Sequence, residues 1–126
     1  MGSTTHQASG RTFQATAVAI EAYSLVTLDS SGTIAASGDN ATEQIIGVTT
    51  EDIDASGYGN VQLLNAGGTI EVLCGGNTIA VADSTYIDGS GKIGTDNTNT
   101  KIGVALQASS SDGDVIELLP HQTFLA

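Results

Sequence analysis

Short apolar runs alternate with polar turns along almost the whole chain. The apolar runs lie at residues 24–29 (SLVTLD), 32–36, 43–50 (EQIIGVTT), 60–65, 69–74 (TIEVLC), 84–88, 101–106 and 115–119. Each run gives way to a turn rich in Gly, Ser, Asp or Asn, or to Pro120. Short strands with turn signals about every ten residues predict an all-β sandwich or barrel. Only residues 77–84 (NTIAVADS) favour a helical turn instead.

The pattern occurs twice, because residues 28–64 resemble residues 87–119. The matches are Asp29, Gly32, Ile34, Ile46, Gly47, Val48, Gly59 and Val61 with Asp88, Gly91, Ile93, Ile102, Gly103, Val104, Gly113 and Val115. Two copies are too few for a solenoid and predict one small β-barrel built from two similar halves, which also removes exposed sheet edges. Gly47 and Gly103 are predicted to mark a bulge or a tight bend, since glycine otherwise weakens a strand.

Residues 1–14 form a predicted flexible N-terminal arm, followed by a single β-barrel domain over residues 15–126. The arm is rich in Ser, Thr, Gly and Gln and shows no periodicity. Phe13 is its one large apolar side chain apart from Met1. Two interpretations of Phe13 remain open: it packs on the chain's own barrel, or it anchors the arm to a partner.

The net charge of −11 changes the range of possible partners. The 126 residues include 14 Asp and Glu residues and only three Lys and Arg residues: Arg11, Lys92 and Lys101. Nucleic-acid binding and attachment to an anionic membrane both require the opposite balance. Repulsion between like charges also lowers the stability of a fold that has few core residues. We therefore expect a soluble protein that oligomerisation stabilises.

Candidate chemistry is sparse, and we expect no enzyme, cofactor or metal. Cys74, the single cysteine, lies in a strand pattern and is predicted to be buried. His6 and His121 have no metal-ligand spacing. The segment DIDASGYGN (52–60) begins like a calcium loop but has Leu63 where a bidentate glutamate is required. A plain turn is the preferred interpretation, and the alternative is a weak surface calcium site.

The second copy resembles the C-terminal signature of the cement, or head decoration, proteins of tailed bacteriophages. That signature joins an xDxVYxDxxxGxI element to xIGVALxxA and a closing strand. It is matched by Asp83, Tyr86, Asp88, Gly91, Ile93, Ile102, Gly103, Val104, Ala105, Leu106, Val115 and Leu118. The first copy resembles the upstream half of the family, including its GxxEV strand at Gly68, Glu71 and Val72. The likeness covers roughly residues 23–120, and Ser84-Thr85 departs from the usual Pro-Val before the tyrosine.

This resemblance implies a homotrimer on the outer surface of the virion. It would bind the major capsid protein at threefold and quasi-threefold positions of the icosahedral head and stabilise the shell against the pressure of packaged DNA. It also implies that the arm docks on the capsid, which makes Arg11, Thr12, Phe13 and Gln14 the candidate binding residues. The alternative is a β-rich adhesin or receptor-binding module of a virion fibre or cell surface, which the low aromatic content disfavours.

Overall fold

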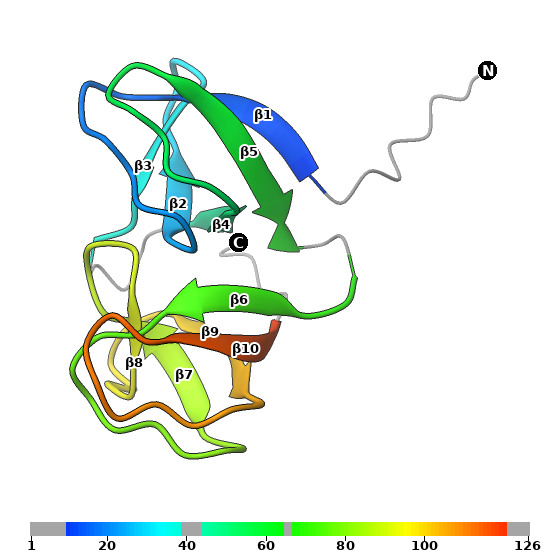
Figure 1. Ribbon diagram of the computed structural model, residues 1–126, viewed down its shortest axis with the longest axis vertical. Coiled ribbons are helices and arrows are strands. Elements are labelled where there is room, and N and C mark those ends of the chain that lie inside the picture. Colours follow the sequence, from blue (N-terminus) through cyan, green and yellow to red (C-terminus); the bar gives the residue numbers. More distant parts are fainter. Residues whose placement is uncertain (1–9, 39–43, 65–66, 121–126) are drawn as a thin grey trace.

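The computed structural model describes residues 10–38, 44–64 and 67–120, which form ten β-strands and no α-helix (Figure 1). No membrane-crossing helix is therefore found in this part of the chain. The strands are β1 (Gly10–Ala15), β2 (Leu25–Leu28), β3 (Thr33–Ala36), β4 (Ile45–Thr49), β5 (Tyr58–Leu63), β6 (Ile70–Leu73), β7 (Ser84–Ile87), β8 (Ile93–Gly94), β9 (Lys101–Ala105) and β10 (Val115–Pro120). The helical turn expected over residues 77–84 is wrong: Ile79 there forms a β-bridge with Ser109.

The strands form two five-stranded sheets, one from each half of the chain. β1 to β5 close into a barrel in the order β1-β3-β2-β4-β5, and the second half forms a sheet in the order β6-β10-β9-β7-β8. Figure 1 shows the barrel above the second, curled sheet. The prediction of an all-β fold built from two similar halves is confirmed.

The halves match strand for strand, including the contact that closes each one. Ala15 pairs in parallel with Ile34, and Cys74, 59 residues further on, pairs in parallel with Ile93. β1 therefore corresponds to β6 and β3 to β8. The turns between β2 and β3 and between β7 and β8 also match, with a positive φ at Gly32 (83°) and at Gly91 (76°). The repeated Asp-x-x-Gly signal of the sequence thus encodes a repeated turn.

The predicted irregularity at the two Ile-Gly-Val segments is confirmed. In the β2–β4 pair the register shifts just before Gly47, and in the β7–β9 pair it shifts just before Gly103. Neither glycine has a positive φ. Each is required because a neighbouring strand comes too close for a side chain: a Cβ at position 103 would lie 2.2 Å from the carbonyl oxygen of Leu119.

The apolar core joins the two halves. One cluster fills the barrel and consists of Phe13, Ala15, Ile20, Val26, Ile34, Ile53 and Val61. The other fills the second sheet and includes Leu25, Ile45, Val48 and Leu64 from the outside of the barrel. Main-chain hydrogen bonds reinforce this contact. Leu25 N donates to Gly91 O at 2.8 Å and Gly91 N donates to Ser37 O at 2.9 Å.

The close approach at Gly103 gives a first prediction. Gly103→Ala forces the β9 and β10 main chains apart, and overpacking of this kind costs about 1–3 kcal/mol of unfolding free energy. Gly76→Ala is the matched control, because no atom lies within 4 Å of the added Cβ and its φ is not positive. Urea unfolding of both variants measures the difference, and equal midpoints would contradict the close-approach explanation.

The turn at Asp29 gives a second prediction, on pH. Its carboxylate accepts hydrogen bonds from the Thr33 hydroxyl at 2.6 Å and from the main-chain N–H groups of Thr33 and Ser31. The Thr33 hydroxyl is the main cause that lowers the pKa of Asp29 below its usual 3.8. A lowered pKa stabilises the fold above the unfolded-state pKa, and this stabilisation is lost as the pH falls through the folded-state pKa.

Asp29→Asn should therefore lower the melting temperature at pH 7. The difference from the unsubstituted protein should shrink as the pH falls below about 4, where the carboxylate of the unfolded chain is already protonated. Thermal unfolding followed by circular dichroism across this pH range measures it. A difference that stays constant down to pH 2 would exclude the carboxylate as its source.

Candidate docking surfaces

The described residues with possible chemical reactivity form no catalytic or metal-binding group. Cys74 is fully buried, and desolvation by this burial raises the pKa of its thiol, which keeps the sulfur protonated. The prediction of a buried cysteine is confirmed. His6 and His121 lie outside the described residues. Within the described ranges, no three or more His, Cys, Asp and Glu side chains gather in a way that could hold a metal ion.

The calcium look-alike at residues 52–60 is tied to the rest of the barrel by its own hydrogen bonds. The Asp52 carboxylate accepts a hydrogen bond from Ala22 N at 2.8 Å, and Gly57 N donates to Asp54 O at 2.8 Å. The adjacent Ser56 has a positive φ of 59°. These contacts fit the turn interpretation, because the Asp52 carboxylate stabilises the β1–β2 connection.

The four candidate arm residues lie in β1, which pairs antiparallel with β5. The structure therefore continues the barrel five residues into the segment interpreted as an arm, and residues 1–9 lie outside the described part. Phe13 is buried in the barrel core, as the first of its two interpretations expects. The Arg11 guanidinium lies 4.8 Å from the centre of the Phe13 ring. Arg11 and Thr12 are exposed and Gln14 is half-buried.

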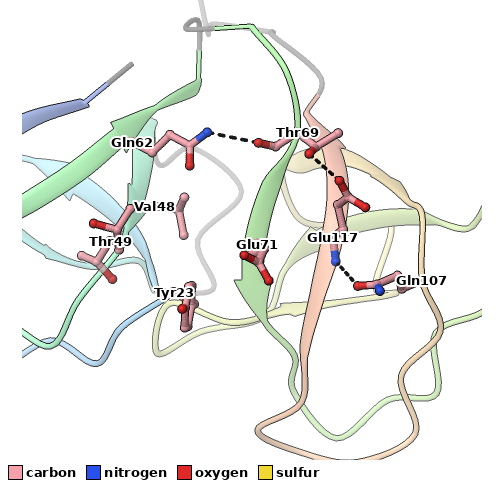
Figure 2. Close-up of a pocket in the computed structure, with 9 residues that line it drawn as sticks. Tyr23, Val48, Thr49, Gln62, Thr69, Glu71, Gln107 and Glu117 are labelled. Carbon is pink, nitrogen blue, oxygen red and sulfur yellow. Dashed lines mark hydrogen bonds between the residues drawn. The ribbon is translucent and has the colours of Figure 1, made fainter. Parts of the chain in front are cut away.

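A polar cleft of about 480 Å³ lies where the two halves meet (Figure 2). Its lining residues are Tyr23, Val48, Thr49, Thr50, Gln62, Thr69, Glu71, Gln107 and Glu117. Two hydrogen bonds across the cleft mark its ends: Leu73 N donates to Tyr23 O at 2.8 Å, and the Gln62 side chain donates to Thr69 O at 3.1 Å. The first half supplies one wall, and β6 and β10 supply the other.

Two carboxylates lie side by side on the β6–β10 wall. Glu71 is directly opposite Glu117 in the antiparallel pair, where Cβ atoms are about 5 Å apart and like charges destabilise the sheet. Glu117 accepts a hydrogen bond from the Thr69 hydroxyl at 2.5 Å, and its N–H donates to Gln107 Oε1 at 2.8 Å. No cationic side chain lines the cleft, so its negative charge has no partner among the lining residues.

An apolar face lies next to this cleft on the outside of β9 and β10. Ala105 and Leu118 pair with each other and are fully buried. Their neighbours Val104, Leu106 and Leu119 therefore point outward, because successive side chains of a strand alternate between its faces. Leu106 is 40% exposed and Leu119 is 52% exposed. Burying these side chains against a partner would be favourable.

The first half shows what normally covers such a face. Val48 pairs with Gln62 on β4 and β5, just as Val104 pairs with Leu119 on β9 and β10. Val48 is only 1% exposed, because the second half packs on it. At the matching position of the second half Val104 is half-buried, and Leu106 and Leu119 beside it are exposed.

Sequence reasoning identified neither the cleft nor the apolar face. Both depend on how the two halves pack, which no local pattern encodes. One signal was present for Glu71: it is the outward-facing polar position in the alternating run TIEVLC.

Comparisons with known proteins give one matching family and one solved structure with the same fold. The family model described as phage cement protein matches residues 4–120. A solved structure of the head fiber gp8.5 N base in bacteriophage phi29 has the same fold, with a TM-score of 0.70 and 20% sequence identity over 93% of this chain and 98% of that one. A search of curated proteins finds no match.

The family match spans nearly the whole chain and includes all ten strands described above. Phage cement proteins are structural components of the virion that bind the exterior of the capsid. The resemblance first noticed in the second sequence copy is therefore confirmed. The chain belongs to the phage cement protein family.

Proposed function

We propose that this chain binds the outer surface of the phage head as a trimer at threefold and quasi-threefold positions, where it clamps neighbouring major capsid subunits against the pressure of packaged DNA. It does this by binding alone, without catalysis. The observation that carries the proposal is the open apolar face of β9 and β10 in a member of a capsid-binding family.

The apolar face supports self-association. Val104, Leu106 and Leu119 are aligned by the β9–β10 register, and Val48, which matches Val104, is covered by the second half. A second copy that covers the open face removes these apolar side chains from water. A contact between different surfaces of identical chains closes into a ring when the rotation permits, and a trimer is one such ring.

The charge of the chain supports a position outside the shell. At −11 the protein is repelled by packaged DNA and kept soluble before it docks. Each copy contributes a modest contact, and many copies on one shell add up to a large stabilisation. This explains why a small protein with a limited core can protect a shell much larger than itself.

The N-terminal residues support a second contact. Arg11 and Thr12 are exposed near the start of β1, the strand that follows residues 1–9 in the sequence. We propose that this segment, with Arg11, Thr12 and Gln14 beside it, adds to an exposed strand of a capsid subunit. Phe13 contributes by holding β1 in the barrel, since its ring is buried.

An adhesin role has less support. Sugar-binding and receptor-binding sites commonly present several aromatic rings, and among the described residues only the aromatic ring of Tyr58 belongs to an exposed residue. Tyr23 and Tyr86 are half-buried and Phe13 is buried.

The trimer contact is tested by giving the apolar face the polar side chains found at the matching positions of the first half. Leu106→Thr with Leu119→Gln copies Thr50 and Gln62 of the first half. Loss of this apolar area should weaken the trimer about tenfold or more, as light scattering over a dilution series would measure.

Val18→Thr with Leu28→Gln is the matched control for this variant. Val18 is 70% exposed and Leu28 is 43% exposed, and both belong to the first half of the chain. The control should associate like the unsubstituted protein. Equal association of the two double variants would exclude the apolar face as the trimer contact.

Binding to the shell is tested by co-sedimentation with expanded, undecorated heads of the phage that encodes the chain. The protein should pellet with them and saturate at the number of threefold and quasi-threefold positions. Absence of co-sedimentation would overturn the proposed function, and saturation at another number would overturn the proposed positions.

The N-terminal contact is tested by removing residues 1–9, which leaves β1 complete. The melting temperature should stay unchanged while shell binding weakens, because the ordered core begins at β1. Removal of residues 1–14 is a poorer test, since it also deletes Phe13 from the core. If shell binding survives the shorter truncation unchanged, the N-terminal segment is not an anchor.

A further inference from the structure

We propose that the cleft between the halves receives an arginine side chain from an extended segment of the shell subunit. The groove along the free edge of β6 is the site, and its two carboxylates set the chemistry of the occupant. The identity of the partner rests on the proposed function, whereas the preference for arginine rests on the cleft itself.

The main chain of β6 offers hydrogen-bonding groups to an occupant. Leu73 N and Thr69 O both point toward the first half, where Tyr23 O and the Gln62 side chain bind them. Glu71 lies midway between these residues, so its N–H and C=O point to the same side. No described residue forms a hydrogen bond with these two groups. The edge is therefore open over one residue, enough for a short contact and too little for a full added strand.

The adjacent carboxylates of Glu71, which is exposed, and Glu117 favour a cation between them. They are neighbours on one face of the β6–β10 pair, and the repulsion between them is not relieved by any residue that lines the cleft. A guanidinium group inserted between them removes this repulsion and can form paired hydrogen bonds to a carboxylate. The planar group can also stack on the ring of Tyr23, which lines the opposite wall (Figure 2).

The fold does not require the ring of Tyr23 or the carboxylate of Glu71. Tyr23 has a positive φ of 65°, and Ala82, its counterpart in the second half, has a positive φ of 76°. The same turn thus forms with alanine, so the ring of Tyr23 serves another purpose. Likewise β1 has Thr12 where β6 has Glu71, and both strands pair normally with their neighbours.

The chain itself is a poor source of the cation. Arg11 stacks on its own Phe13, and Lys92 forms an ion pair with Asp112 at 2.9 Å. Lys101 is the only other basic residue in the sequence. A second copy is therefore a weaker candidate than a different protein with its own basic side chains. Under the proposed function, the protein in contact with this surface is the shell subunit.

The first experiment tests the cleft without any shell. N-acetyl-arginine methylamide and its uncharged analogue N-acetyl-citrulline methylamide are titrated against the full chain, and amide chemical shifts are recorded by NMR. The arginine probe should shift Tyr23, Glu71 and Glu117, and Glu71→Gln should reduce these shifts. No shift in the cleft, or equal shifts with both probes, would overturn the preference for arginine.

The second experiment tests the cleft on the shell. Glu71→Gln and Glu117→Gln should each weaken co-sedimentation with expanded heads about tenfold, since removing one member of a close charge pair typically costs at least that much. Asp54→Asn is the matched control, because it removes the same charge from an exposed residue outside the cleft. Light scattering should show the same trimer for all three variants.

The outcomes separate the two proposals. If the unsubstituted protein does not bind heads, the proposed function fails and the probe titration still decides on the cleft. If it binds and the Glu71 and Glu117 variants bind equally well, the function stands and the inference about the cleft is overturned.

Discussion

The packing of the barrel's outer face against the second half is the contact on which the rest of the structure depends. The side chains of Leu25 and Val48 pack in the core of the second sheet and not in the barrel core. Gly91 forms main-chain hydrogen bonds with Leu25 and Ser37. Gly91 has no Cβ, and one placed there would lie 2.7 Å from that of Ser24. This close contact fixes the angle between the halves, and the angle in turn creates the cleft lined by Glu71 and Tyr23.

The two halves share a fold, but matching positions in them have different surroundings. The two copies can therefore carry different surfaces. Val48 is buried inside the molecule, whereas Val104 at the matching position is half-buried beside the exposed Leu106 and Leu119. Apolar side chains at the open face are therefore free to serve a partner without cost to the internal contact. In the same way Thr12 and Glu71 occupy matching positions, and only Glu71 faces the other half. Duplication thus supplies two similar scaffolds on which different surfaces can be built.

The sequence predicted those parts of the fold that depend on local signals. Turns and the Ile-Gly-Val bulges repeat in both copies, so the two-half β architecture could be inferred. Residues 10–14 of β1 were assigned to the arm because the segment 1–14 is rich in Ser, Thr, Gly and Gln and has no apolar periodicity. The sequence alignment of β5 with β10, based on the preceding glycines, matched Val61 with Val115. In the structure β5 pairs with β1 and β10 pairs with β6, and these registers place Leu118 at the position of Val61. The register of a strand is set by partner strands that are distant in sequence. The cleft and the open face depend on the same distant contacts.

The cleft and the apolar face are close enough to act together. Glu117 and Leu119 lie two residues apart on the same side of β10, one in the cleft and the other on the apolar face. A partner held at one surface is therefore already positioned near the other. When two contacts are held on one rigid strand, the second forms at a high effective concentration and requires little further loss of freedom. Under the proposed function, association between copies and docking on the shell would therefore favour each other.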